Sequence, residues 1–112
     1  MWKNQKIIIS KIEMKETNNT YEVIYILKPD LPEDSLLRAM ETYQTLLIET
    51  EVTNLTTQNR GRRPFKYPIK KFNDGIYIQM NFEGSQIVLP SLEKTMKLDE
   101  NIIRSLITRL NK

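Results

Sequence analysis

The residues with the clearest capacity for chemistry lie together between positions 60 and 71, in the stretch RGRRPFKYPIKK. Six basic residues and no acidic residue occur there, whereas the whole chain has a formal net charge of only +3. Arginine provides planar forks that match phosphate oxygens, and lysine adds point charges. The stretch therefore predicts a polyanionic partner, with RNA or DNA ahead of an anionic membrane surface. The candidate binding residues are Arg60, Arg62, Arg63, Lys66, Lys70 and Lys71.

The apolar residues of the same stretch alternate with the basic ones. Strand periodicity puts Phe65, Tyr67 and Ile69 on one side, and it puts Arg60, Arg62, Lys66 and Lys70 on the other. We expect Phe65 and Ile69 to face the core, and leave Tyr67 open between the core and stacking on a base. The competing interpretation of the charges is a solvated edge strand that Lys and Arg protect from pairing.

The composition argues against catalysis. The 112 residues include no Cys and no His, which removes thiol chemistry, disulfides and the usual general base near neutral pH. Acidic neighbours such as Asp99 and Glu100 fit helix ends or turns, and no glycine-rich phosphate-cradling pattern is present. No apolar run approaches the roughly 20 residues that cross a bilayer. We therefore expect no enzyme activity, no cofactor or metal, no small-molecule substrate and no membrane.

The length suits one domain. Residues 1–19 are polar and Lys-rich apart from a short isoleucine cluster, and fit neither a secretory signal nor a transit peptide. We expect an N-terminal extension over 1–19, which is a mobile tail or a short extra strand or helix, and a folded domain over 20–112. Within the domain, β-branched and aromatic residues predict a central strand over 21–27.

A helix should follow that strand. Asp30 and Glu33 are spaced like a capping box. The predicted buried stripe consists of Leu36, Met40, Tyr43 and Leu47, and the helix should end near residue 51.

Residues 52–71 predict an extended strand, which lies at an edge of the sheet or is interrupted by bulges. Pro64 and Pro68 cannot donate ladder hydrogen bonds, and Gly61 suits a bulge. Asn73, Asp74 and Gly75 supply turn chemistry, so a hairpin should lead into a strand over 76–82 with one buried face.

The rest of the chain predicts a helix and a strand. Val88, Leu92 and Met96 repeat at helical spacing, with Pro90 making the first turn irregular. Residues 102–110 predict the last strand. The order is that of the split βαβ arrangement, so the expected fold is α+β, a ferredoxin-like βαββαβ sandwich. Its four-stranded antiparallel sheet carries two helices on one face and leaves the other face open.

Among ferredoxin-like RNA binders, the RNA-recognition motif stacks bases on aromatic residues of its third strand. The corresponding strand here, GIYIQMNF, lacks that pattern and offers only Tyr77 beside Gln79 and Asn81. The sequence fits better with a protein that recognises nucleic acid by its shape and its phosphates. Two other classes stay open. One is a regulatory or small-ligand domain that oligomerises through its open sheet face. The other is an acylphosphatase-like enzyme, although residues 28–31 contain neither Gly nor Arg for an anion-cradling loop.

Three separated stretches resemble one known family. They are YEVIYILKPDLPED at the first strand, GRRPFKYPIKK before a strand ending in MNFEG, and NIIRSLITRL at the end. In this order they resemble the bacterial-type small-subunit ribosomal protein six family, here called S-six, from Thr20 to about Asn111. The sequence YILKPDL is most similar to the cyanobacterial and plastid branch of this family.

The resemblance implies a structural constituent of the small ribosomal subunit. It implies binding to the central domain of the small-subunit rRNA together with ribosomal protein eighteen, in support of platform assembly and translation. The six basic residues would meet rRNA or the partner protein. The implied location is the chloroplast ribosome, with the bacterial cytoplasm as the alternative, and the high content of Ile, Lys and Asn fits an A+T-rich plastid genome.

Overall fold

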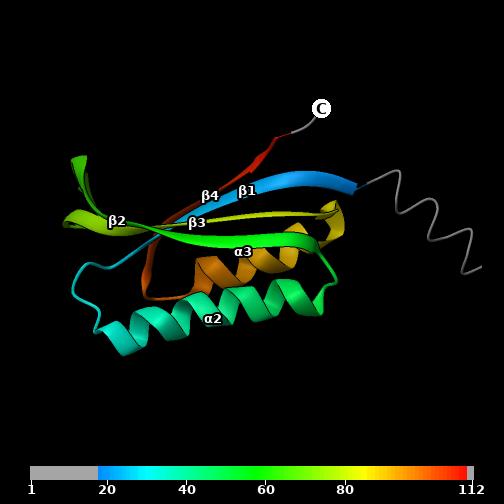
Figure 1. Cartoon of the computed structure of the whole chain (residues 1–112). Helices are drawn as coiled ribbons and strands as arrows, with labels where there is room; N and C mark the ends of the chain where they lie inside the picture. The colour runs from blue at the N-terminus through cyan, green and yellow to red at the C-terminus, as the bar shows by residue number, and fades with distance from the viewer. Residues whose placement is uncertain (1–17, 111–112) are drawn as a thin grey trace, which may run out of the picture.

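The elements follow the predicted order. A computed structural model describes residues 18–110 as a four-stranded antiparallel sheet with two helices on one face (Figure 1). The elements are β1 (Asn18–Leu27), α2 (Glu33–Glu49), β2 (Thr53–Ile69), β3 (Phe72–Ser85), the 3₁₀ turn η1 (Gln86–Val88), α3 (Leu89–Leu98) and β4 (Ile102–Arg109). The strand order β2-β3-β1-β4 makes β1 and β3 central. The predicted ferredoxin-like sandwich is confirmed.

The N-terminal extension predicted over 1–19 falls mostly outside the described residues. Its residues 1–17 are among those not described, and Asn18 and Asn19 are the first residues of β1. Within the described range, no helix is both long and apolar enough to span a membrane.

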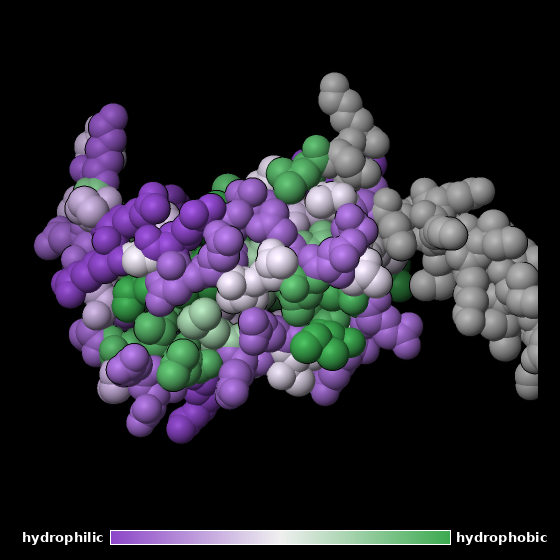
Figure 2. Space-filling view, in the orientation of Figure 1, coloured by the Kyte–Doolittle hydropathy of each residue, from purple (hydrophilic) through white to green (hydrophobic). Residues whose placement is uncertain are grey.

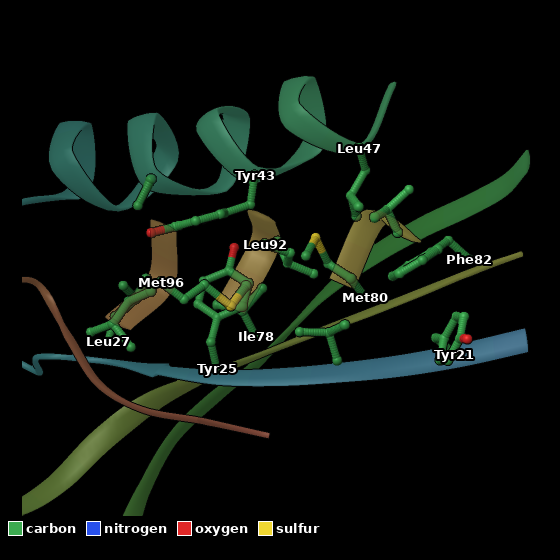
Figure 3. Close-up of a cluster of buried hydrophobic side chains, with 14 residues drawn as sticks. Tyr21, Tyr25, Leu27, Tyr43, Leu47, Ile78, Met80, Phe82, Leu92 and Met96 are labelled. Carbon is green, nitrogen blue, oxygen red and sulfur yellow. The ribbon is translucent and has the colours of Figure 1, made fainter. Parts of the chain in front are cut away.

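The core lies between the sheet and the helices. Successive residues of a strand point to opposite faces, and every second residue of the central strands is buried beneath the helices: Tyr21, Val23, Tyr25 and Leu27 in β1, and Ile78, Met80 and Phe82 in β3. Figure 3 shows these side chains meeting Tyr43 and Leu47 of α2 and Leu92 and Met96 of α3. The predicted central strand and the predicted buried face of β3 are therefore confirmed.

The start of α2 differs from the prediction. Pro32 occupies the N-cap position with an extended backbone, and no side chain caps the helix, so the capping box from Asp30 is wrong. Asp30 lies two residues before the cap, and the fixed φ of Pro32 sets the direction of the chain there. The predicted stripe is confirmed in Tyr43 and Leu47, which are buried, while Leu36 and Met40 are partly buried against the core.

The second helix begins irregularly, as Pro90 predicted. Residues Gln86–Val88 form a single 3₁₀ turn, and Ser85 Oγ accepts a hydrogen bond from the Ile87 amide at 3.4 Å. Pro90 then occupies the first turn of α3, where its missing N–H would have no partner anyway.

A hydrogen bond joins α2 to the turn between α3 and β4. The Tyr43 hydroxyl donates to Asp99 Oδ2 at 2.6 Å, while Asp99 Oδ1 accepts from the Asn101 amide at 2.9 Å. Burial and the Asp99 carboxylate raise the pKa of Tyr43 far above its ordinary value, so its proton stays in place. The ring of Tyr25 lies 5.1 Å from that of Tyr43, but its buried hydroxyl has no partner among the described residues.

Removing the hydroxyl oxygen of each tyrosine should have different effects on the free energy of unfolding. Tyr43→Phe should lower the free energy of unfolding by about 1–2 kcal/mol, because a hydrogen bond to a charged group is lost. Tyr25→Phe should change it by less than about 0.5 kcal/mol or raise it, because no bond is lost. Urea denaturation of both variants measures the difference. Equal losses would contradict the assigned hydrogen bond.

The turn of the β2–β3 hairpin lies at Lys70 and Lys71, not at the predicted Asn73–Gly75. Ile69 pairs with Phe72, and the two lysines between them have φ of 50° and 72°. Asn73 and Gly75 belong to β3.

Gly75 is needed for close packing rather than for a turn. A Cβ at this position would lie 2.4 Å from Ile26 Cγ2, 3.0 Å from Phe65 Cζ and 3.1 Å from the Leu27 carbonyl oxygen. The glycine therefore lets the hairpin lie directly against the end of β1.

Gly75→Ala should therefore destabilise the protein by about 1–3 kcal/mol through overpacking. The cost should fall when the same change is made in an Ile26→Ala background, because the nearest obstructing atom is then gone. Thermal or urea unfolding of the four proteins in this cycle measures the coupling. A Gly75→Ala variant as stable as the parent would show that the close approach is wrong.

Candidate nucleic-acid interface

All six predicted basic residues lie on the exposed hairpin formed by β2 and β3. Arg60, Arg62, Arg63 and Lys66 belong to β2, and Lys70 and Lys71 form its turn; each is exposed. β1 pairs with β3 only from Ile76 onward, so the end of the hairpin is two-stranded and projects beyond the sheet. Figure 2 shows hydrophilic residues over this projecting end.

A bulge in β2 divides the arginines between the two faces of the hairpin. The register shifts between Asn59 and Gly61, and Gly61 has φ of 92°, a value that favours glycine. The bulge predicted at this glycine is confirmed. Beyond it, the alternation of side chains is reset, so sequence parity no longer tells which cation faces which side.

Arg60 and Arg63 lie on the sheet face opposite the helices. Arg60 Nε donates to Gln79 Oε1 at 2.9 Å, and the Arg63 guanidinium lies 5.9 Å from the centre of the Tyr77 ring. Arg62 lies on the other side of the hairpin, where its Nε donates to Asp74 Oδ2 at 2.6 Å. The expectation that Arg60 and Arg62 share one side is therefore wrong.

The aromatic residues of the stretch also lie differently from the prediction. Phe65 packs on the open face, with its ring centre 6.3 Å from that of Tyr77. Tyr67 is 72% exposed, and Ile69 is only partly buried beside the turn. None of the three belongs to the buried core cluster. The expectation that Phe65 and Ile69 face the core is wrong, because this part of the hairpin extends beyond the region of the sheet that the helices cover.

The open face carries an apolar band between these arginines. Tyr77, Ile26 and Arg104 are paired side by side across β3, β1 and β4, and Gln79, Ile24 and Leu106 form the next row. We call Ile24, Ile26, Phe65, Tyr77 and Leu106 the open-face patch. Leu106 is 62% exposed, whereas Ile26 is buried, with only 7% of its surface exposed. The sequence pointed to Tyr77, but strand parity alone left the orientation of Leu106 undecided.

The cations are mostly not neutralised by the protein. Within residues 18–110 the single ion pair is that of Arg62 with Asp74. Arg60 is held by an uncharged amide, and Lys66, Lys70 and Lys71 have no acidic partner in the described range. The segment thus presents several charges that are free to meet an anion.

The turn lysines have a backbone that lysine rarely adopts. A two-residue hairpin turn with positive φ at both positions favours Asn and Gly. The left-handed conformation costs a residue with a Cβ roughly 1 kcal/mol. Lys70 and Lys71 therefore occupy a place where other residues would fold more easily.

The acidic residues of the described part of the chain do not form a metal-binding cluster. Over 18–110, no three Asp or Glu residues come together as a potential metal site. The Asp99 carboxylate is engaged by Tyr43 and Asn101 in a structural role.

Comparison with known proteins agrees with this geometry. The sequence model of the family described as ribosomal protein S6 matches residues 20–109. The chain is 52% identical over 92 residues to small ribosomal subunit protein bS6c of Guillardia theta, which covers 82% of this chain and 96% of that protein. It is 39% identical over 95 residues to small ribosomal subunit protein bS6 of the cyanobacterium Microcystis aeruginosa, covering 85% and 74%.

A solved structure supports the same relationship. The crystal structure of 30S ribosomal protein S6 from Thermotoga maritima superposes with a TM-score of 0.76 at 28% identity. The match covers 83% of this chain and 88% of that one. The resemblance seen in the sequence is confirmed: the chain belongs to the ribosomal protein S6 family, in its plastid and cyanobacterial branch.

Proposed function

We propose that this protein binds the central domain of the small-subunit rRNA together with ribosomal protein eighteen, and thereby supports assembly of the platform. Membership of the family makes it a structural, non-enzymatic protein of the small ribosomal subunit. The observation that carries the finer proposal is the projecting hairpin with its unneutralised cations. Within residues 18–110, no group of acidic residues that could hold a metal ion competes with it.

The hairpin suits contact with phosphates. Its lysines are exposed, and its arginines stand on both faces of a two-stranded ribbon. A ribbon of this kind can approach a folded RNA from its end without reading bases. The candidates for binding rRNA or the partner protein remain Arg60, Arg62, Arg63, Lys66, Lys70 and Lys71.

The open-face patch suits a protein partner. Aromatic residues and arginine are enriched at the centres of protein interfaces, while Lys and Glu are depleted there. The patch combines Phe65 and Tyr77 with the flanking Arg63, and its Leu106 is exposed. We assign this face to ribosomal protein eighteen, and assign the lysines of the hairpin to rRNA.

The chloroplast ribosome is the location. Relatives that carry the bS6c name come from algae, and bS6 proteins of cyanobacteria follow closely. The chloroplast location expected from the sequence of the first strand is thus confirmed.

The division of roles predicts two separable losses. Lys66→Gln with Lys71→Gln should weaken rRNA binding and lower the slope of log affinity against log salt by about one for each lysine. Arg63→Gln with Tyr77→Ala should weaken binding of protein eighteen instead, because it removes the centre of the open-face patch. Filter binding of central-domain rRNA and pull-down of protein eighteen measure the two effects.

The parent protein sets the reference for these variants. Phosphate contacts by the three hairpin lysines, Lys66, Lys70 and Lys71, predict a salt slope of roughly −2 to −3 in the presence of protein eighteen. A flat salt response would overturn the proposal of rRNA binding. A chain that self-associates through its open face and ignores rRNA would favour the alternative, an oligomerising regulatory domain.

A further inference from the structure

A hollow of about 450 Å³ is lined by Lys70 of the hairpin turn together with residues of α3 and β4. Four basic residues and one acidic residue line it: Lys70, Lys94, Lys97, Arg104 and Glu93. A second hollow of about 420 Å³ shares Lys70 and Lys97 and adds Lys28 from the end of β1. We call Lys28, Lys70, Lys94, Lys97 and Arg104 the turn-hollow cluster. Four of its five members come from outside the basic stretch.

The cluster is assembled by the fold rather than by the sequence. β1 contributes its end, the hairpin its turn, α3 its last two turns and β4 its start. The Lys28 ammonium lies 5.9 Å from the centre of the Phe72 ring, directly after the turn. Scattered lysines are thereby brought around one concave surface.

The five cations of the cluster outnumber the three acidic residues that line the two hollows, Glu93, Asp99 and Glu100. Within the described range, no member of the cluster forms an ion pair. Asp99, which lines the second hollow, has both carboxylate oxygens engaged, one by Tyr43 and one by Asn101. Glu93 and Glu100 are exposed.

The backbone of the turn gives independent evidence. Lys70 and Lys71 both have positive φ, where Asn and Gly fold more easily. Backbone conformations that a residue adopts at a cost gather at functional positions. Both lysines are exposed at the turn, where their ammonium groups are accessible to an anion.

We propose that the turn-hollow cluster binds phosphates of a folded RNA backbone, as a contact additional to those of Lys66 and Lys71 on the hairpin. The inference rests on the proposed function, because it assigns a further part of this surface to the same RNA. It identifies Lys28, Lys94, Lys97 and Arg104 as RNA-contacting residues, and it gives Lys70 a place in a concave site. A concave cluster of cations strengthens attraction to an anion relative to the same charges on a flat surface.

The first test removes two charges from α3. Lys94→Gln with Lys97→Gln should lower the salt slope for central-domain rRNA by about 1.6 and weaken binding roughly 40-fold at 0.1 M salt, since each phosphate contact contributes about 0.8 to the slope and hence about 0.8 of a decade of affinity at this salt concentration. Arg38→Gln is the matched control, because Arg38 is an exposed cation on α2 that lines neither hollow. It should bind within about twofold of the parent. An equal loss in both variants, or no loss in the first, would overturn the inference.

The second test separates folding from binding. Lys70→Asn with Lys71→Gly places preferred residues in the turn, so the variant should melt at or above the temperature of the parent. It should nevertheless bind the rRNA fragment more weakly. A variant that binds like the parent would overturn the inference.

The two proposals fail in different ways. If the parent protein shows no salt-dependent rRNA binding, the proposed function itself is wrong. If the parent binds with a steep salt slope while the α3 variant matches it, the proposed function stands and the turn-hollow cluster is not part of the interface.

Discussion

The structure depends on the close contact between the β2–β3 hairpin and the end of β1. Gly75 permits this contact, because any side chain there would collide with Ile26 and Phe65. From this point the hairpin leaves the sheet with only two strands, and no helix covers it. Its side chains therefore have no core to enter. The cations are exposed because β2 and β3 extend further than the strands beside them, β1 and β4.

One backbone irregularity decides what each cation can meet. The bulge at Gly61 turns Arg60 and Arg63 to the open face and leaves Arg62 on the other side, where Asp74 engages it. The same shift places Phe65 beside Tyr77 instead of in the core. A single glycine with a positive φ thus produces two different surfaces from one basic stretch. One is an aromatic and aliphatic patch edged by arginine, and the other is a lysine-rich end.

The sequence was sufficient for the architecture because its periodicities are strong. Tyr21 to Leu27 is a run of mostly β-branched and aromatic residues, and Ile76 to Phe82 alternates. Both helices turn the stripes that their spacing indicated toward the core, although Leu36 and Met40 are only partly buried. Orientation beyond the bulge could not be predicted, because parity is lost once an extra residue enters a strand. The turn was misplaced for a related reason: Asn73–Gly75 has turn chemistry, but Gly75 serves packing, and two lysines adopt the left-handed conformation instead. The cations of the turn hollow were missed because they are isolated in the sequence and meet only in the fold.

The central claim is that the end of the hairpin lies against rRNA, and a tethered cleavage probe tests it most directly. The chain has no cysteine, so one introduced thiol carries an iron chelate at a single position. Asn73 is exposed directly after the turn, and Arg38 is exposed on α2. In assembled small subunits, hydroxyl radicals from Asn73→Cys should cut the central domain of the rRNA at defined nucleotides, while those from Arg38→Cys should cut it weakly or not at all. Strong cleavage from α2 with none from the hairpin would contradict the account.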